Sequence, residues 1–207
     1  KVAIKTDSLS KRLYAQDASV YEETPKGVAF PENADDIVSL VKQAAAKKWS
    51  ITARSAGTSL AGQTTGDGLI MDVSRHMTKV LEWNIEERWV RVEPGIIRDQ
   101  LNRMAAPQEL LFGPDTATAS RCMIGGMIGN NSAGLYSITY GSTRNHVIEM
   151  DVVLSDGSRM IAKPLTDEEL EQKCAQKNLE GHIYRELLEL LHEHKEAIEA
   201  HYPHKAI

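Results

Sequence analysis

Two stretches of the chain are rich in glycine, alanine and hydroxylated residues, and they constrain its fold more than any other feature. One covers residues 54–63, and the other, at residues 124–134, contains four glycines. Side chains this small leave little to pack as an ordinary core helix, but they let another group come close to the backbone. Both stretches are therefore expected to lie against a ligand.

The pattern around the first stretch predicts strands that alternate with helices. Residues 28–30 form a short apolar run that ends at Pro31, and Asn33 is placed to cap a helix whose apolar residues share one face. Residues 50–53 have the pattern of the next strand. Because that strand runs directly into residues 54–63, the small-residue loop is expected to leave a strand end.

Further strands and helices are expected toward the C-terminus. Residues 148–154 have a strand pattern, and Asp156-Gly157 is a hairpin turn signal. The other expected elements are strands at residues 69–71 and around Val80 and Val90, a helix near residues 97–104, and helical structure from Thr166 onward. Together these elements favour an α+β fold.

Charge and cysteine content favour chemistry on small molecules. The chain has 207 residues, 42% of them hydrophobic, and a formal net charge of −5. This charge gives no general field that would attract nucleic acid, and no apolar run approaches the length of a membrane span. Cys122 and Cys174 stand far apart without metal-type spacing, which indicates reduced thiols, no metal site and a cytoplasmic location. We therefore expect no nucleic-acid partner and no membrane span.

The first small-residue loop has the composition of a phosphate-binding nest. Gly57 permits a backbone angle that other residues resist, and the neighbouring hydroxyls can add hydrogen bonds to backbone N–H groups that meet a pyrophosphate. An ordinary polar turn is the alternative interpretation of residues 54–59. The two common nucleotide-binding glycine templates are absent, because residues 125–129 fit neither spacing.

A set of motifs in this chain resembles the motifs of the FAD-linked oxidases of the vanillyl-alcohol oxidase and p-cresol methylhydroxylase superfamily. The resemblance lies in the order of the motifs and in their approximate separations. The resemblance is greatest to the D-lactate and glycolate dehydrogenase branch. The motifs are Asp17, Pro25, Pro31, residues 54–63, Asp72, Val92-Glu93-Pro94-Gly95, Pro114-Asp115, residues 125–134, Tyr140-Gly141 and Asp156-Gly157.

The resemblance implies an extended FAD held between two lobes. Pyrophosphate contacts are expected in the first loop, from Ser55, Ala56, Gly57, Thr58 and Ser59, and Arg54 and Gln63 are expected to be cofactor-binding residues as well. Contacts to the flavin and ribityl side are expected from Pro114, Asp115, Ser120, Gly125, Gly126, Gly129, Asn130, Ser132 and Gly134. Val147 and Ile148, expected on the strand after Tyr140-Gly141, would lie against the adenine end, with plain sheet core as the alternative for both.

The resemblance also bears on how the cofactor is attached. Many members of the family link FAD through a histidine, but Thr58 stands at the corresponding place in this loop. Cys122 is a conceivable thioether donor, although a small buried cysteine beside a glycine segment is the more common state. We therefore expect non-covalent, dissociable FAD. No catalytic base can be named.

One two-lobed FAD-binding domain over residues 1–207 is expected, with a small α/β lobe at about residues 1–75 and a larger lobe of mixed or antiparallel sheet and helices at about residues 76–207. The family's C-terminal substrate or cap domain is expected to be absent from this chain. The implied function is oxidation of a 2-hydroxy acid, such as D-lactate, glycolate or D-2-hydroxyglutarate, by hydride transfer to FAD, with an unknown electron acceptor. The alternatives are the FAD domain of a sugar-nucleotide reductase and a non-catalytic nucleotide-binding module.

Overall fold

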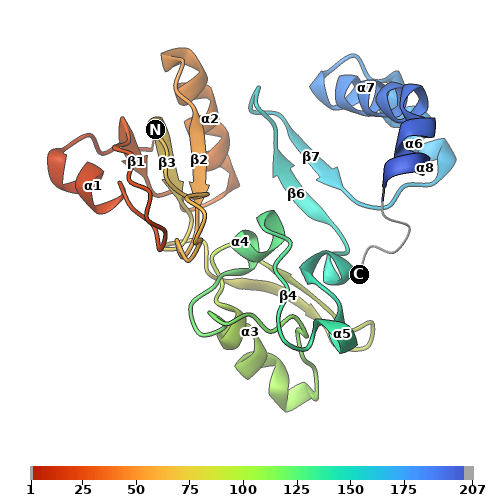
Figure 1. The fold of residues 1–207 in the computed structure, drawn as a ribbon, viewed down its shortest axis with the longest axis horizontal. Helices are drawn as coiled ribbons and strands as arrows, with labels where there is room; N and C mark the ends of the chain where they lie inside the picture. The colour runs from red at the N-terminus through yellow and green to blue at the C-terminus, as the bar shows by residue number, and fades with distance from the viewer. Residues whose placement is uncertain (1, 203–207) are drawn as a thin grey trace. The chain divides into compact units, whose positions relative to one another are not determined.

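A parallel three-stranded sheet with one crossover helix forms the first part of the molecule. The computed structural model describes residues 2–202. The sheet and its helix comprise β1 (Gly27–Ala29), α2 (Ala34–Lys47), β2 (Ile51–Arg54) and β3 (Leu69–Asp72). The strand order is β1-β3-β2, so β3 is the central strand and pairs in parallel with both neighbours. Figure 1 shows α2 beside these strands.

Local signals set the limits of α2, and its apolar face builds the core of this region. The Asn33 side chain accepts a hydrogen bond from the Asp36 N–H, and Lys48 ends the helix in the left-handed conformation. Leu40 and Ala44 then pack with the strand residues Ala29, Leu69 and Met71. Full burial of a leucine such as Leu40 stabilises the fold by about 1.5–3 kcal/mol. The predicted strands and helix here are confirmed.

A second core lies beneath an antiparallel strand pair and several short helices. Its elements are β4 (Val80–Asn84), β5 (Trp89–Val92), α3 (Arg98–Ala105), η1 (Ala106–Gln108), α4 (Ile124–Gly129), α5 (Ser137–Tyr140) and η2 (Thr143–His146). The buried residues of this core are Ile96, Leu101, Cys122, Ile124 and Met127. A helix that the sequence did not predict, α1 (Ser8–Leu13), precedes all of these elements and begins at the capping side chain of Asp7.

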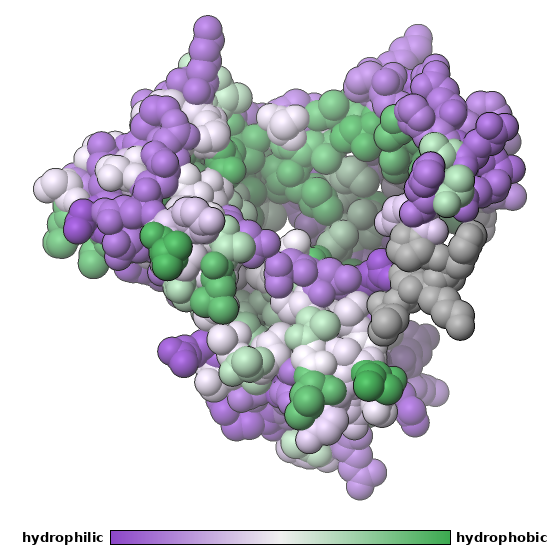
Figure 2. Space-filling model, in the orientation of Figure 1, coloured by the Kyte–Doolittle hydropathy of each residue, from purple (hydrophilic) through white to green (hydrophobic). Residues whose placement is uncertain are grey.

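The chain divides into two compact units, of which the first ends at Val147 and the second begins at Ile148. The second unit contains β6 (Met150–Val153), β7 (Arg159–Ala162), α6 (Asp167–Ala175), α7 (Leu179–Glu193) and α8 (Lys195–His201). Gly157 has a φ of +81° in the β6–β7 turn, as the Asp-Gly signal predicted. In the view of Figure 2, hydrophilic residues cover most of the displayed face of the three helices.

The α+β class is confirmed by this mixture of parallel sheet, antiparallel pairs and helices. The expected division into lobes near residue 75 stays a prediction, and its outer limits at residues 1 and 207 lie outside the described residues. Among residues 2–202, no helix is both long enough and apolar enough to cross a membrane.

Candidate functional site

The first small-residue loop leaves the end of β2, where the sequence placed it. Gly57 has a φ of +66°, in the left-handed region that favours glycine. Within the described part of the chain, the backbone N–H groups of residues 56–60 have no hydrogen-bond acceptor. Consecutive unpaired donors beside a left-handed residue are the feature of an anion-binding nest. The loop can therefore meet a phosphate with backbone groups that the fold itself does not use.

The Arg54 side chain is held by the protein. Its Nη1 donates a hydrogen bond to the Gln16 carbonyl at 2.8 Å, and its guanidinium lies 5.1 Å from the centre of the Tyr14 ring. A methyl group built at Gly57 would come within 2.7 Å of Arg54 Nη2, so the guanidinium also lies against the loop. The Arg54 guanidinium therefore helps to support the loop. The contact of Arg54 with the cofactor stays a prediction.

The end of the first loop is joined to the second small-residue stretch by side chains. Ser59 Oγ donates to Gln63 Oε1 at 2.7 Å, and Gln63 Nε2 donates to Asn130 Oδ1 at 3.1 Å. The two stretches also meet at Ser55 and Gly126, because a methyl group at Gly126 would lie only 2.5 Å from Ser55 Oγ. Residues predicted separately as pyrophosphate and flavin contacts thus lie side by side.

The second stretch differs from the expectation that it cannot pack as a core helix. Residues 124–129 form the short helix α4, in which Ile124 and Met127 are buried in the second core and Ile128 packs against it. Ile124 and Met127 share one face because residues three positions apart are neighbours on a helix. Gly125 lies against Pro94, whereas Gly126 and Gly129 are exposed. The helix therefore has one packed face and one face open to a ligand.

Close backbone contact fixes the rest of this stretch. A Cβ atom at Gly134 would collide with the Asp115 carbonyl oxygen, so only glycine lets these two segments cross. The Ser132 carbonyl accepts a hydrogen bond from Thr143 Oγ1 at 2.7 Å, and Thr143 is fully buried. Gly134 and Asp115, both predicted cofactor residues, are thus brought together.

Arg98 supports the Pro114-Asp115 turn and was not predicted from the sequence. Its Nε donates to the Pro114 carbonyl at 3.1 Å, and its Nη1 lies 2.8 Å from Asp99 Oδ1 and 3.3 Å from Asp115 Oδ1. The Arg98 side chain is only 11% exposed, so these contacts are shielded from solvent. An arginine at the start of an amphipathic helix gives no local signal of such a role.

The predicted adenine contacts are placed differently from the expectation. Val147 and Ile148 precede β6, which begins at Met150, so neither lies on that strand. β6 begins no earlier than Met150 because Met150 pairs with Ala162, the last residue of β7. Two residues further along, Pro164 lacks the N–H that continued pairing would need. Ile148 is 60% exposed, which argues against its alternative assignment to a sheet core. Ser120 is exposed in the turn before Cys122, and among the described residues no hydrogen bond joins it to the other predicted residues.

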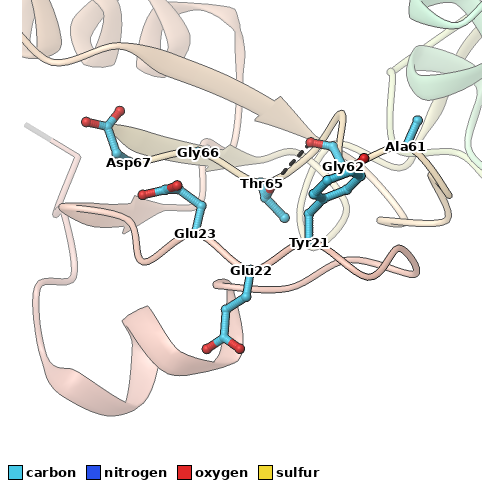
Figure 3. Close-up of a pocket in the computed structure, with 8 residues that line it drawn as sticks. All are labelled: Tyr21, Glu22, Glu23, Ala61, Gly62, Thr65, Gly66 and Asp67. Carbon is cyan, nitrogen blue, oxygen red and sulfur yellow. Dashed lines mark hydrogen bonds between the residues drawn. The ribbon is translucent and has the colours of Figure 1, made fainter.

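An open pocket of about 600 Å³ borders the end of the first loop at Ala61 and Gly62. Figure 3 shows the Tyr21 ring beside Gly62, and the Thr65 hydroxyl donates to the Gly62 carbonyl at 3.0 Å. Its other lining residues include the carboxylates of Glu22, Glu23 and Asp67. Three carboxylates disfavour a pyrophosphate, and none of the predicted cofactor residues lines this pocket.

Comparison with known proteins gives a family match and several relatives. The family model described as "FAD binding domain" matches residues 25–162. A D-2-hydroxyglutarate dehydrogenase of Pseudomonas putida is 39% identical over 203 residues, which are 97% of this chain and 20% of that protein. The glycolate oxidase subunit GlcD of Bacillus subtilis is 36% identical over 73% of this chain and 33% of its own length.

A solved structure of another protein is similar to this chain in fold. The crystal structure of 6-hydroxy-D-nicotine oxidase from Arthrobacter nicotinovorans is similar with a TM-score of 0.69 at 21% identity. The similarity covers 82% of this chain and 37% of that one. The chain thus spans about a fifth of the first curated relative and about a third of this structural neighbour.

Proposed function

Because the chain belongs to the FAD binding domain family, we propose that residues 54–63 and 124–134 together hold FAD. The family match confirms the resemblance seen in the motifs and supports FAD as the cofactor. The observation that carries the proposal is the junction of the two stretches, at Gln63 with Asn130 and at Ser55 with Gly126, next to a run of unpaired backbone N–H groups.

Each stretch has its own part in this proposal. The backbone and hydroxyl groups of residues 55–59 meet the pyrophosphate, and Arg54 and Gln63 keep the two ends of that loop in place. The flavin and ribityl side lies along Pro114, Asp115, Ser120, Gly125, Gly126, Gly129, Asn130, Ser132 and Gly134. Val147 and Ile148 contact the adenine end. Thr58 offers no imidazole for a histidyl linkage, so the cofactor is held without a covalent bond.

The whole protein is proposed to oxidise a 2-hydroxy acid, with D-2-hydroxyglutarate as the favoured substrate. Support comes from the relatives, since four with 35–41% identity are named D-2-hydroxyglutarate dehydrogenase. When bound, FAD would accept the hydride from the alcohol carbon. This chain orients the cofactor and excludes water along the two stretches. We assign the catalytic base and the groups that bind the substrate carboxylate to no residue of this chain.

We further propose a reducing, cytoplasmic setting, which is supported by the two free cysteines, Cys122 and Cys174.

Purification of the chain with FAD tests the binding step. We expect visible flavin absorption, and mass spectrometry of the released cofactor should identify FAD and not FMN. Anaerobic addition of D-2-hydroxyglutarate to the natural polypeptide that contains this segment tests the reaction, with the L-enantiomer as control. Bleaching of the flavin by the D-enantiomer alone is the expected result. A colourless protein after incubation with excess FAD would refute the binding step, and equal bleaching by both enantiomers would refute the substrate.

A further inference from the structure

The N-terminal segment before the family match is attached to the first small-residue loop at three successive points. The family match begins at residue 25, whereas the segment in question is residues 14–18. Arg54, at the start of the loop, donates to the Gln16 carbonyl. Gly57, at its left-handed turn, accepts a hydrogen bond from the Ala18 N–H at 3.1 Å. Thr64, at its end, donates to Asp17.

The attachment at Asp17 uses both oxygens of a carboxylate. Oδ1 accepts the Ser19 N–H at 2.8 Å, and Oδ2 accepts the Thr64 hydroxyl at 3.1 Å and the Thr64 N–H at 3.4 Å. Burial opposes ionisation, but these hydrogen bonds hold the pKa of Asp17 below its usual value. The carboxylate is therefore charged at neutral pH and accepts from both donors of Thr64.

The attachment at Gly57 sets the direction of a neighbouring donor. The carbonyl of Gly57 and the N–H of Thr58 belong to one peptide group, and in a planar trans peptide they point in opposite directions. Because the carbonyl is held by Ala18, the Thr58 N–H points away from the N-terminal segment. That N–H is one of the unpaired donors of the loop.

We propose that Asp17 is a positioning residue for FAD, and that residues 14–18 hold the loop in the conformation that binds the pyrophosphate. This inference rests on the proposed function, because it assigns a role toward the cofactor in that site. It predicts that a change at Asp17 weakens FAD binding although its side chain does not touch the cofactor. A purely structural role would instead lower thermal stability and leave the affinity of the folded protein unchanged.

Asp17→Asn is the principal test, measured on the full chain by titration with FAD. The amide keeps the size of the side chain but is uncharged and has one oxygen in place of two, so it cannot accept from both Ser19 and Thr64. We expect the Kd for FAD to rise about tenfold, the change that corresponds to one lost charge-assisted hydrogen bond. Hydrogen exchange at the Ser19 or the Thr64 amide in the FAD-free chain should become faster in the same variant, because one of these two N–H groups loses its acceptor.

Two matched controls separate positioning from stability. Arg12→Gln removes the exposed Arg12–Glu22 ion pair outside residues 14–18, leaves the Gln16–Glu22 hydrogen bond in place, and should leave the Kd unchanged. Ile37→Val trims a side chain that packs on the first core and should lower Tm without weakening FAD binding.

A second variant keeps the test open if Asp17→Asn fails to fold. Thr64→Val removes the hydroxyl bond to Asp17 alone and should raise the Kd in the same direction. The double variant should bind FAD no more weakly than Asp17→Asn, because both changes remove the same contact. Wild-type affinity in Asp17→Asn, or a loss no larger than that of Ile37→Val, would overturn the inference and leave the proposed function standing. A wild-type chain that binds no FAD would overturn the proposed function itself.

Discussion

Gln63 Nε2 donates a hydrogen bond to Asn130 Oδ1 at 3.1 Å across 67 positions of sequence, and this bond joins the two small-residue stretches. Asn130 Nδ2 lies 3.4 Å from Ser132 Oγ, and Ser59 Oγ donates to the other end of the Gln63 amide. Polar side chains of four predicted cofactor residues thus form one chain of contacts. The residues around this chain give the predictions that follow.

Gly57→Val should weaken FAD binding far more than it harms folding. A β-branched residue at a φ of +66° costs roughly 1–3 kcal/mol, and its side chain would displace Arg54 and block close approach of the pyrophosphate. Flavin content after purification and Tm are the two measurements. Gly157→Val is the matched control, because Gly157 has a φ of +81° in the β6–β7 turn of the second unit. Equal flavin content in Gly57→Val and the wild type would remove the nest from the proposed site.

Gly129→Ala should show whether the space beside Gly129 is occupied by the cofactor, because the protein itself leaves that space open. A methyl group at Gly129 would meet no protein atom within 4 Å, so the change should stabilise α4 by up to about 1 kcal/mol. If Gly129 lies along the flavin, the same methyl group should raise the Kd for FAD. Gly126→Ala is the comparison, since its methyl group would displace Ser55 Oγ within the proposed site and should lower affinity. A stabilised Gly129→Ala chain with unchanged affinity would place the flavin elsewhere.

Denaturation should release all of the flavin into solution. Thr58 has no imidazole for a histidyl bond, and Cys122 is buried, with its Sγ 3.1 Å from Thr116 Oγ1 and 3.5 Å from Met127 Sδ. Acid precipitation followed by absorption spectra of the supernatant and the pellet measures the release. Flavin that remains with the precipitated protein would contradict this prediction, and a Cys122→Ser variant would then show whether Cys122 is the point of attachment.

Tyr14 should titrate late and stabilise the fold up to high pH. Burial and the Asp72 carboxylate, which accepts its hydroxyl at 2.5 Å, raise the pKa of Tyr14 from 10.0 to about 12. Because the folded pKa is the higher one, the stabilisation is complete below pH 10 and is lost as the pH rises toward 12. The tyrosinate absorbance of wild type minus that of Tyr14→Phe gives the titration of this residue alone. A midpoint near 10 in that difference would show that the environment of Tyr14 does not hold its proton.

Local signals explain which parts of the fold could be predicted from the sequence. Asn33 as a helix cap and Gly157 in a hairpin turn depend on residues a few positions apart, and the structure confirms both. Contacts between residues far apart in the sequence have no such local signal. The support of Asp115 by Arg98 and the joining of Gln63 to Asn130 depend on how the elements pack, which no local pattern encodes.

Two differences between the expected and the observed structure have the same physical origin. Residues 147–148 were placed on a strand because the apolar pattern begins there, but pairing depends on the partner strand, and Pro164 ends that pairing. The glycines of residues 124–134 predict poor packing, yet Ile124 and Met127, with Ile128 beside them, pack one face of α4 into the core. In both cases the neighbours of a segment decided its structure.

The order of the first sheet has a consequence for how the chain folds during synthesis. Its central strand β3 is the last of the three in sequence, and β1 and β2 each pair with β3 and not with one another. On the ribosome, α2 can therefore form early, and β1 can bridge to Lys5, but neither outer strand can pair within the sheet until residues 69–72 emerge. Non-local parallel pairing of this kind is slow and leaves strand edges open in the meantime. The loop at residues 54–63 emerges before β3, so its contacts with residues 14–18 are available before the strand end that carries it is fixed in the sheet.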